Sequence, residues 1–414
     1  MNSWLIAILL IIIIGFLLDS CISLLNLKAL DPALPEEFSS VYNQDEYAKS
    51  QEYTRVTTKF SLVSSTVSTL LTLAFLLLGG FNAVDIFARS FEFNEILTGL
   101  VYAGCLMLLS YIVSLPFSIY STFVIEERFG FNRTTVKTFI LDTIKGTLLA
   151  IALGGPLLAL ILWFFNATGS MAWIYCWAGV VVFSIIIQFL APVLIMPLFN
   201  KFSPLGEGEL KTRIMNYAEQ ERFKLQGIFT MDGSKRSTKL NAFFTGFGKF
   251  RKIVFFDTLV DKLETDEIVA VLAHEMGHFK LKHVLKMMAG SILQTGFIFF
   301  LLSLVLGNEQ LFEAFSMEYV SVYAGLFFFG FLYSPVNLLV SVLFNALSRK
   351  HEYQADAYAV RTTGEKDYLI SGLKKLCQAN LSNLTPHPAA VFLEYTHPPV
   401  LVRIKAIREL IIKE

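Results

Sequence analysis

Long apolar runs recur along the chain at lengths that suit helices crossing a lipid bilayer. Such a helix needs about 20 mostly apolar residues. Seven stretches meet this requirement, roughly residues 4–25, 60–78, 96–125, 146–165, 171–199, 287–306 and 320–347. The first could instead be a signal peptide, but it has no Lys or Arg ahead of its apolar core and no small-residue cleavage pattern after it. The pattern therefore predicts a mainly α-helical membrane protein with seven transmembrane helices.

Lys and Arg alternate between the connections of these spans. Residues 26–59 and 126–145 hold four basic residues each, whereas 79–95 hold one and 166–170 hold none. Because cytosolic loops carry the excess of Lys and Arg, this distribution predicts an N-terminus outside. It also predicts a cytosolic location for the two long polar segments and the C-terminus.

Several spans contain more polar residues than contact with lipid favours. The second span alone contains Ser61, Ser64, Ser65, Thr66, Ser68, Thr69 and Thr72. These hydroxyls could form hydrogen bonds between helices or line a water-filled cavity among them. The sequence leaves both interpretations open.

The spans and polar segments divide the chain into four parts. Residues 1–199 form five transmembrane helices, 200–286 the first part of a catalytic domain, 287–347 helices six and seven, and 348–414 the second catalytic part. In the first catalytic part we expect a helix at 210–222 and strands at 227–231, 240–245 and 252–256, with a turn at 246–248. These strands would form a small antiparallel sheet. A further helix would start at Thr265 as its N-cap.

That last helix carries the motif His274-Glu275-Met276-Gly277-His278. Histidines four residues apart stand one turn apart on one face, where both imidazoles can reach one tetrahedral Zn²⁺. Glu275 lies beside them and could take a proton from a water molecule that the metal activates. The alternative is a set of solvated polar residues on a cytosolic helix.

Catalytic zinc takes three protein ligands and keeps a fourth position open. The third ligand predicted here is Glu352, and Asp356, one turn further along, could orient a ligand histidine. An exposed carboxylate pair is the alternative. His351 is a weaker candidate ligand, and we expect His283 to be solvated.

Helix continuity predicts where this metal lies. Neither Pro nor Gly interrupts residues 279–289 or residues 336–363. The first ligand helix could therefore run directly into the sixth span, and the seventh span could continue into the helix of Glu352. Both ligand segments would then meet at the inner face of the membrane.

Composition limits the partners. Lys plus Arg and Asp plus Glu both number 34, so the formal net charge is zero, and only 16% of the residues are charged. A neutral chain lacks the basic footprint of nucleic-acid binding. The partners expected are membrane lipid and a peptide or protein substrate, with no nucleic acid.

The chain resembles the type I CAAX prenyl endopeptidases, a family of integral-membrane zinc metalloproteases. The likeness runs nearly from end to end and rests on an ordered set of motifs. These are Phe123-Val124-Ile125-Glu126-Glu127-Arg128-Phe129-Gly130-Phe131-Asn132, Pro197-Leu198-Phe199-Asn200-Lys201-Phe202, Asn241-Ala242-Phe243, the His274–His278 motif, Glu352-Tyr353-Gln354-Ala355-Asp356-Ala357, and His397-Pro398-Pro399 followed by Arg403.

The resemblance implies seven helices forming a barrel around a chamber, closed on the inner side by a zincin-like domain. It also implies one Zn²⁺ per chain with His274, His278 and Glu352 as ligands. Glu275 would be the base, with Asp356 supporting a ligand. His397 would stabilise the oxyanion, with Arg403 beside it. Asn241, Ala242 and Phe243, on an edge strand, would hold the substrate backbone by strand addition.

The resemblance implies a peptidase whose substrate could be prenylated at its C-terminus. The short C-terminal sequence lacks a dilysine signal, which favours a bacterial cytoplasmic membrane over the endoplasmic reticulum or inner nuclear membrane. A quality-control metalloprotease acting on unprenylated or misfolded membrane proteins is one alternative. A non-catalytic chambered transporter or lipid-binding protein is another, although the intact Glu275 argues against it.

Overall fold

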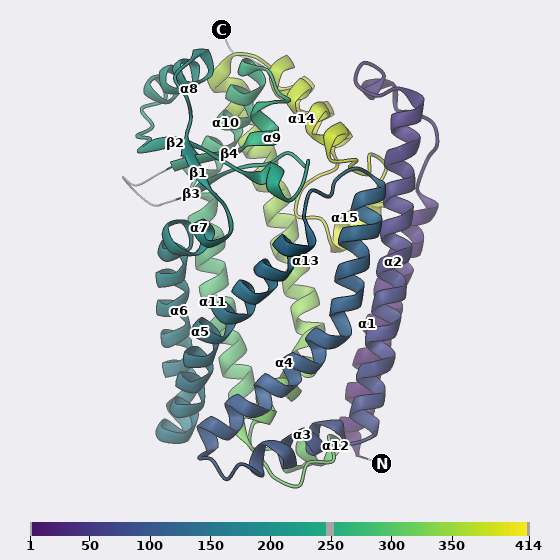
Figure 1. Ribbon diagram of the computed structural model, residues 1–414, viewed down its shortest axis with the longest axis vertical. Coiled ribbons are helices and arrows are strands. Elements are labelled where there is room, and N and C mark those ends of the chain that lie inside the picture. The colour runs from purple at the N-terminus through teal and green to yellow at the C-terminus, as the bar shows by residue number, and fades with distance from the viewer. Residues whose placement is uncertain (1, 246–251, 412–414) are drawn as a thin grey trace.

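A computed structural model describes residues 2–245 and 252–411 of the chain. Long helices run along the molecule between a small end and a larger polar end (Figure 1). The N-terminus lies at the small end and the C-terminus at the polar end. The predicted turn at 246–248 and the C-terminal residues 412–414 lie outside the described residues.

Six helical stretches of the described chain are long and apolar enough to cross a membrane, and one of them, Val136–Phe199, contains two long helices. In that stretch α5 and α6 are joined by a single turn at Gly169–Met171. The described chain thus has the seven long helices that the apolar pattern predicts. They are α1 (Ser3–Lys28), α2 (Gln44–Leu77), α4 (Glu95–Tyr120), α5 (Val136–Thr168), α6 (Ala172–Leu190), α11 (His283–Val305) and α13 (Val322–Thr363).

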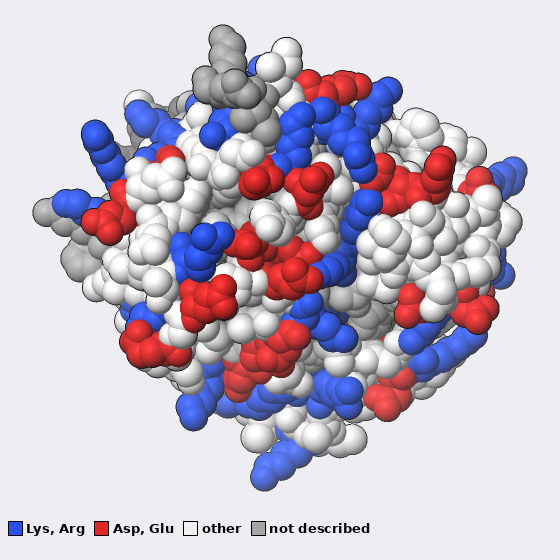
Figure 2. All heavy atoms as spheres, turned by 90° about the horizontal axis from the view of Figure 1, so that it is seen from above, with Lys and Arg blue, Asp and Glu red and all other residues white. Residues whose placement is uncertain are grey.

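Short elements cover both ends of these helices. At the small end lie α3 (Gly80–Arg89) and α12 (Glu309–Ala314), where Phe81, Phe315 and Phe328 pack in a buried cluster. At the polar end lie α7 (Met196–Phe199), α8 (Glu209–Gln220), α9 (Asp257–Val260), α10 (Thr265–Lys280), α14 (Asp367–Ala379), α15 (Pro388–Leu393) and α16 (Val400–Glu409). Acidic and basic side chains crowd this end with both signs interspersed (Figure 2).

The polar end also contains a four-stranded sheet in the order β1-β2-β4-β3. Its strands are β1 (Phe202–Pro204), β2 (Gly227–Met231), β3 (Ala242–Thr245) and β4 (Lys252–Phe256). The prediction of an antiparallel sheet is wrong, because β2 and β4 are parallel. Strands β3 and β4 pair antiparallel, and β4 rather than β3 lies beside β2. This order leaves β3 at an edge.

The helix of the zinc motif begins and ends differently from the prediction. Its N-cap is Glu264 rather than Thr265, in a reciprocal capping box with Glu267. It ends at Lys280, and Lys282 takes a left-handed conformation with φ of 59°. The prediction that this helix runs unbroken into the sixth span is therefore wrong. By contrast, α13 runs unbroken from the membrane region past Glu352, as predicted.

Two cavities lie between the long helices of the described chain. A cavity of about 900 Å³ lies between α6, α11 and α13 and reaches the zinc motif. A second cavity of about 790 Å³ lies among α2, α4 and α13 and is lined by Ser64, Ser68 and Thr72. Ser65 and Thr66 instead donate hydrogen bonds to the Leu62 carbonyl of their own helix. Three hydroxyls of the second span thus line a cavity, and two others form hydrogen bonds within their own helix.

Candidate active site

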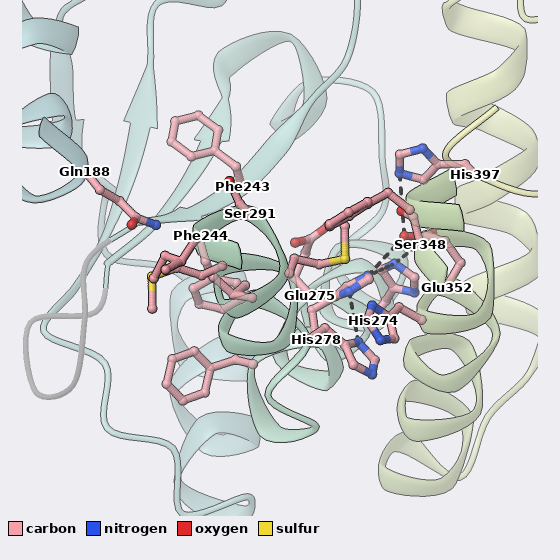
Figure 3. Close-up of a pocket in the computed structure, with 18 of the residues that line it drawn as sticks. Gln188, Phe243, Phe244, His274, Glu275, His278, Ser291, Ser348, Glu352 and His397 are labelled. Atoms are coloured by element: carbon pink, nitrogen blue, oxygen red, sulfur yellow. Dashed lines mark hydrogen bonds and ion pairs between the residues drawn. The ribbon is translucent and has the colours of Figure 1, made fainter. Parts of the chain in front are cut away.

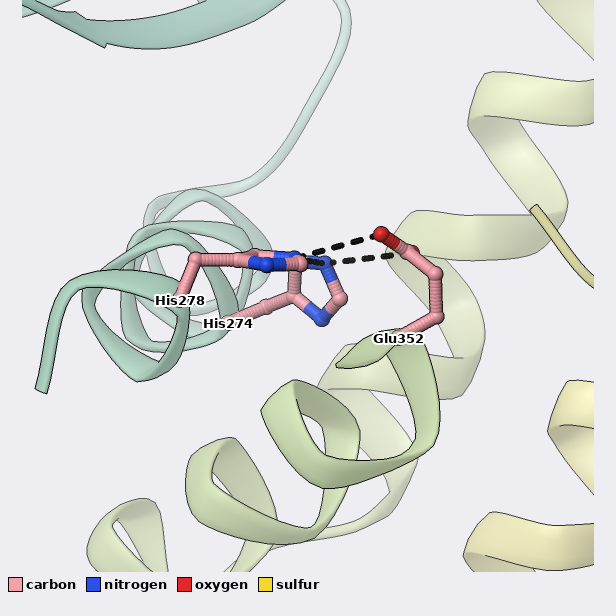
Figure 4. A group of neighbouring side chains, drawn as sticks. All are labelled: His274, His278 and Glu352. Carbon is pink, nitrogen blue, oxygen red and sulfur yellow. Dashed lines mark hydrogen bonds and ion pairs between the residues drawn. The ribbon is translucent and has the colours of Figure 1, made fainter. Parts of the chain in front are cut away.

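Three side chains from two helices converge at the polar end of the 900 Å³ cavity. His274 and His278 come from α10 and Glu352 from α13, and the three point toward one another (Figure 4). The Nε2 atoms of the two histidines lie 3.1 Å apart. Glu352 Oε1 lies 3.2 Å from Nε2 of His278, and Oε2 lies 3.5 Å from Nε2 of His274.

These separations fit a tetrahedral zinc ion. With bonds of about 2.0–2.1 Å, two ligand atoms of a tetrahedral site stand about 3.3 Å apart. The donor set of two imidazoles and one carboxylate is one that catalytic zinc uses. Glu352 Oε2 is also buried and accepts no hydrogen bond among the described residues, although Arg403 Nη1 lies 3.3 Å away in an ion pair; a buried carboxylate oxygen of this kind suits cation binding.

A close approach of the two helices brings Glu352 to the histidines. At Gly277, inside the zinc motif, an added Cβ would lie 3.1 Å from the Ala355 Cα atom and 3.1 Å from the Tyr358 Cβ atom. Backbone atoms cannot move aside as a flexible side chain can. A glycine at this position therefore permits the spacing between α10 and α13 that the metal site requires.

Asp356 and Arg403 form a buried charged pair behind His274. Asp356 Oδ1 lies 2.8 Å from His274 Nδ1, and Arg403 donates to both Asp356 oxygens at 2.7 and 2.9 Å. Burial disfavours protonation of His274, but the hydrogen bonds to Asp356 and Glu352 outweigh it and raise the pKa of His274 to about 9. The carboxylates of Asp356 and Glu352 thus stabilise positive charge at this site.

Four of the other predicted site residues line the same cavity, namely Phe243, Glu275, His397 and Arg403. Glu275 lines it, and Phe243 and Phe244 lie on its strand side (Figure 3). His397 lies on the other side, with Nε2 3.5 Å from Glu352 Oε1 and two-thirds of its side chain exposed (66%). Asn241 directly precedes β3, and its carbonyl accepts a hydrogen bond from the Phe256 amide. Ala242 is the first residue of β3.

The expectation that His283 is solvated is wrong. His283 is only 2% exposed, and its ring stacks on His351 at a centroid distance of 3.9 Å. His351 is itself buried and contacts His283 in this way; it does not belong to the three-residue metal group. The sequence offered one indication of a role for His283, which is its position five residues after His278. Its contact with His278 depends on the break between α10 and α11, and neither Pro nor Gly marks that break in the sequence.

A zinc site of this kind, at the end of seven membrane-spanning helices, defines an integral-membrane metallopeptidase. Comparison with known families agrees. Residues 23–201 match the family described as CAAX prenyl protease N-terminal, five membrane helices, and residues 204–411 match Peptidase family M48. The chain belongs to the CAAX prenyl protease 1 family of M48 zinc metalloendopeptidases.

Individual relatives extend this likeness over nearly the whole chain. The chain is 38% identical to the CAAX prenyl protease 1 homolog of Arabidopsis thaliana, over 95% of both proteins. It is 36% identical to CAAX prenyl protease 1 of Saccharomyces cerevisiae, over 92% of this chain and 89% of that protein. The crystal structure of S. mikatae Ste24p is 35% identical and superposes with a TM-score of 0.93, covering 98% of this chain and 99% of that one.

These findings confirm the predicted family, the membrane fold and the zinc ligands His274, His278 and Glu352. The protein is a multi-pass integral membrane enzyme that acts on peptides. The relatives named above are eukaryotic, so the comparisons give no support to the expectation of a bacterial membrane.

Proposed function

We propose that this protein removes the last three residues of prenylated C-a-a-X proteins at the cytosolic face of a membrane. The observation that carries the proposal is the 38% identity, over 95% of both chains, to a relative named as a CAAX prenyl protease. The cavity at the zinc ligands supports it, because it extends between α6 and α11, where Ile185 and Met287 line it. An isoprenoid chain has the apolar character of such a lining.

The substrate backbone would bind beside β3. An edge strand offers unpaired amide and carbonyl groups to an extended peptide, and β3 is at an edge of the sheet next to the cavity. Asn241, Ala242 and Phe243 would then hold the peptide in register with the zinc ligands. Phe243 would also cover one side chain of the substrate.

The residues around the metal would divide the chemistry of hydrolysis. Bound zinc supplies Lewis acidity, which polarises the scissile carbonyl and lowers the pKa of the attacking water. Glu275 would accept the proton of that water on its carboxylate and deliver it to the nitrogen of the leaving amine. His397 would donate a hydrogen bond to the oxyanion, and Arg403 would keep Asp356 and Glu352 in place through its ion pairs.

The proposed orientation follows from the basic loops. Residues 26–59, residues 126–145 and the catalytic segments carry the excess of Lys and Arg and would be cytosolic. The N-terminus, α3 and α12 would be outside. With eukaryotic relatives, the membrane proposed is the endoplasmic reticulum or the inner nuclear membrane.

Two peptides of identical sequence, one farnesylated at its C-a-a-X cysteine and one not, test the proposal with purified protein. We expect release of the tripeptide from the farnesylated peptide only, loss of release with a chelator, and recovery when zinc is restored. Equal cleavage of both peptides, or cleavage only of a loosely folded membrane protein, would favour a quality-control protease instead.

A further inference from the structure

A chain of polar side chains lies behind His278, on the side away from the metal. His283, the first residue of α11, places its Nδ1 atom 3.2 Å from Nδ1 of His278. Its other ring nitrogen, Nε2, lies 3.0 Å from Oε1 of Gln354 on α13. These two contacts therefore connect the zinc ligand His278 to α13, the helix that carries the zinc ligand Glu352.

Only one arrangement of protons satisfies all of these contacts with zinc bound. A histidine that binds metal through Nε2 carries its proton on Nδ1, so His278 must donate from Nδ1. His283 must then accept at Nδ1 and carry its own proton on Nε2. That proton is directed at Gln354 Oε1, which can only accept. Each contact fixes the donor and acceptor of the next.

The break between α10 and α11 makes this contact possible. In an unbroken α-helix a residue five positions after His278 would lie about 140° around the axis, facing away. The left-handed conformation of Lys282 redirects the chain directly before His283. The His283 ring then turns back against His278, where stacking on His351, with an interplanar angle of 9°, fixes its plane.

We propose that His283 is a positioning residue that, with Gln354, fixes the tautomer and the ring orientation of the zinc ligand His278. The two histidine ligands are then supported in different ways. His274 donates a hydrogen bond to Asp356, which is paired with Arg403. His278 instead donates to the neutral imidazole of His283, which in turn donates to the side-chain amide of Gln354. The neutral partner holds the second ring without adding negative charge to the centre.

Three substitutions separate hydrogen bonding from packing. His283→Leu removes the acceptor and leaves the His278 Nδ1 proton without a partner. His283→Asn restores an acceptor oxygen near the position of Nδ1. His351→Phe is the matched control, because it keeps an aromatic ring on His283 and changes no hydrogen bond to a zinc ligand.

The readout is the zinc dissociation constant of the full-length protein, measured by competition with a chelator, together with the thermal midpoint of the metal-free form. Loss of a partner behind a metal ligand weakens affinity about 10–100-fold. We expect a weakening of that size in His283→Leu. We expect His283→Asn and His351→Phe to bind zinc within about threefold of the parent.

The outcomes are decisive in both directions. A parent-like zinc affinity in His283→Leu, or equal weakening in His283→Leu and His283→Asn, would overturn the proposal. Equal weakening in His351→Phe would also overturn it, by assigning the effect to packing. If His283→Leu does not fold, Gln354→Leu decides: zinc affinity several-fold weaker supports the chain of hydrogen bonds, and unchanged affinity refutes it.

Discussion

The two segments that carry the zinc ligands enter the membrane in different ways. Glu352 lies on α13, which runs without interruption over Val322–Thr363. His274 and His278 lie on α10, which ends at Lys280 and is followed by α11 after a left-handed residue. The helix α13 is therefore continuous from the membrane region to the metal site, whereas α10 ends two residues beyond the zinc motif.

The difference shows how each segment serves the site. The continuous α13 carries Glu352, Gln354 and Asp356 at fixed spacing, so it presents the third ligand and the support for both histidines together. The broken segment folds His283 back onto His278. The metal site is thus formed by one continuous helix, α13, and one interrupted segment, α10–α11.

Removal of the ligand on the continuous helix should have the largest effect. Glu352→Ala removes a metal-binding carboxylate and one of the two carboxylates that pair with Arg403. We expect zinc affinity to fall by more than the ~100-fold typical of an outer partner, with loss of peptidase activity. Metal analysis of purified protein measures this. Glu365→Ala, an exposed carboxylate just after α13, is the control, and full zinc occupancy in Glu352→Ala would contradict the assignment.

A methyl group at the contact between α10 and α13 should have an intermediate effect. Gly277→Ala places a Cβ 3.1 Å from backbone and Cβ atoms of α13, so the helices must separate. Overpacking of this kind costs about 1–3 kcal/mol, and the thermal midpoint and zinc affinity should fall together. Gly104→Ala, where an added Cβ meets nothing within 4 Å, is the control. An unchanged midpoint in Gly277→Ala would show that the spacing is not tight.

The smallest effect is expected at the break itself. A non-glycine residue in the left-handed conformation costs about 1–2 kcal/mol, which glycine avoids at a smaller entropic cost. Lys282→Gly should therefore stabilise the protein by about 0.5 kcal/mol without changing zinc affinity. Lys286→Gly, inside α11, should destabilise it by about 1 kcal/mol. Thermal unfolding of the two variants compares them, and destabilisation by Lys282→Gly would argue against a break at this residue.

Patterns that depend on neighbouring residues predicted most of the fold. The apolar runs predict all seven long helices, and short strand-forming segments with a turn signal between them predict β2 and β4 to the residue. The span predicted from Phe60 begins sixteen residues earlier, at Gln44, because residues 44–59 are mostly polar and the apolar pattern does not detect them. The metal ligands were predictable because four-residue spacing on a helix brings side chains together.

Features that depend on tertiary contacts were not predictable. Strand β4, rather than β3, lies beside β2, and the two run parallel, whereas β3 pairs antiparallel with β4 at the edge of the sheet. The break at Lys282 has no Pro or Gly to mark it, so the burial of His283 could not be read from the sequence. The contact between Gly277 and Ala355 joins two segments that are 78 residues apart.

The most direct test of the account is the variant Glu275→Gln, assayed for zinc content and for peptidase activity together. The amide has the shape of the carboxylate but cannot accept the proton of the attacking water. We expect one zinc per chain, as in the parent protein, and a fall in turnover of about 10²-fold or more. Near-normal turnover with zinc in place would contradict the assignment of Glu275 as the base of this metallopeptidase.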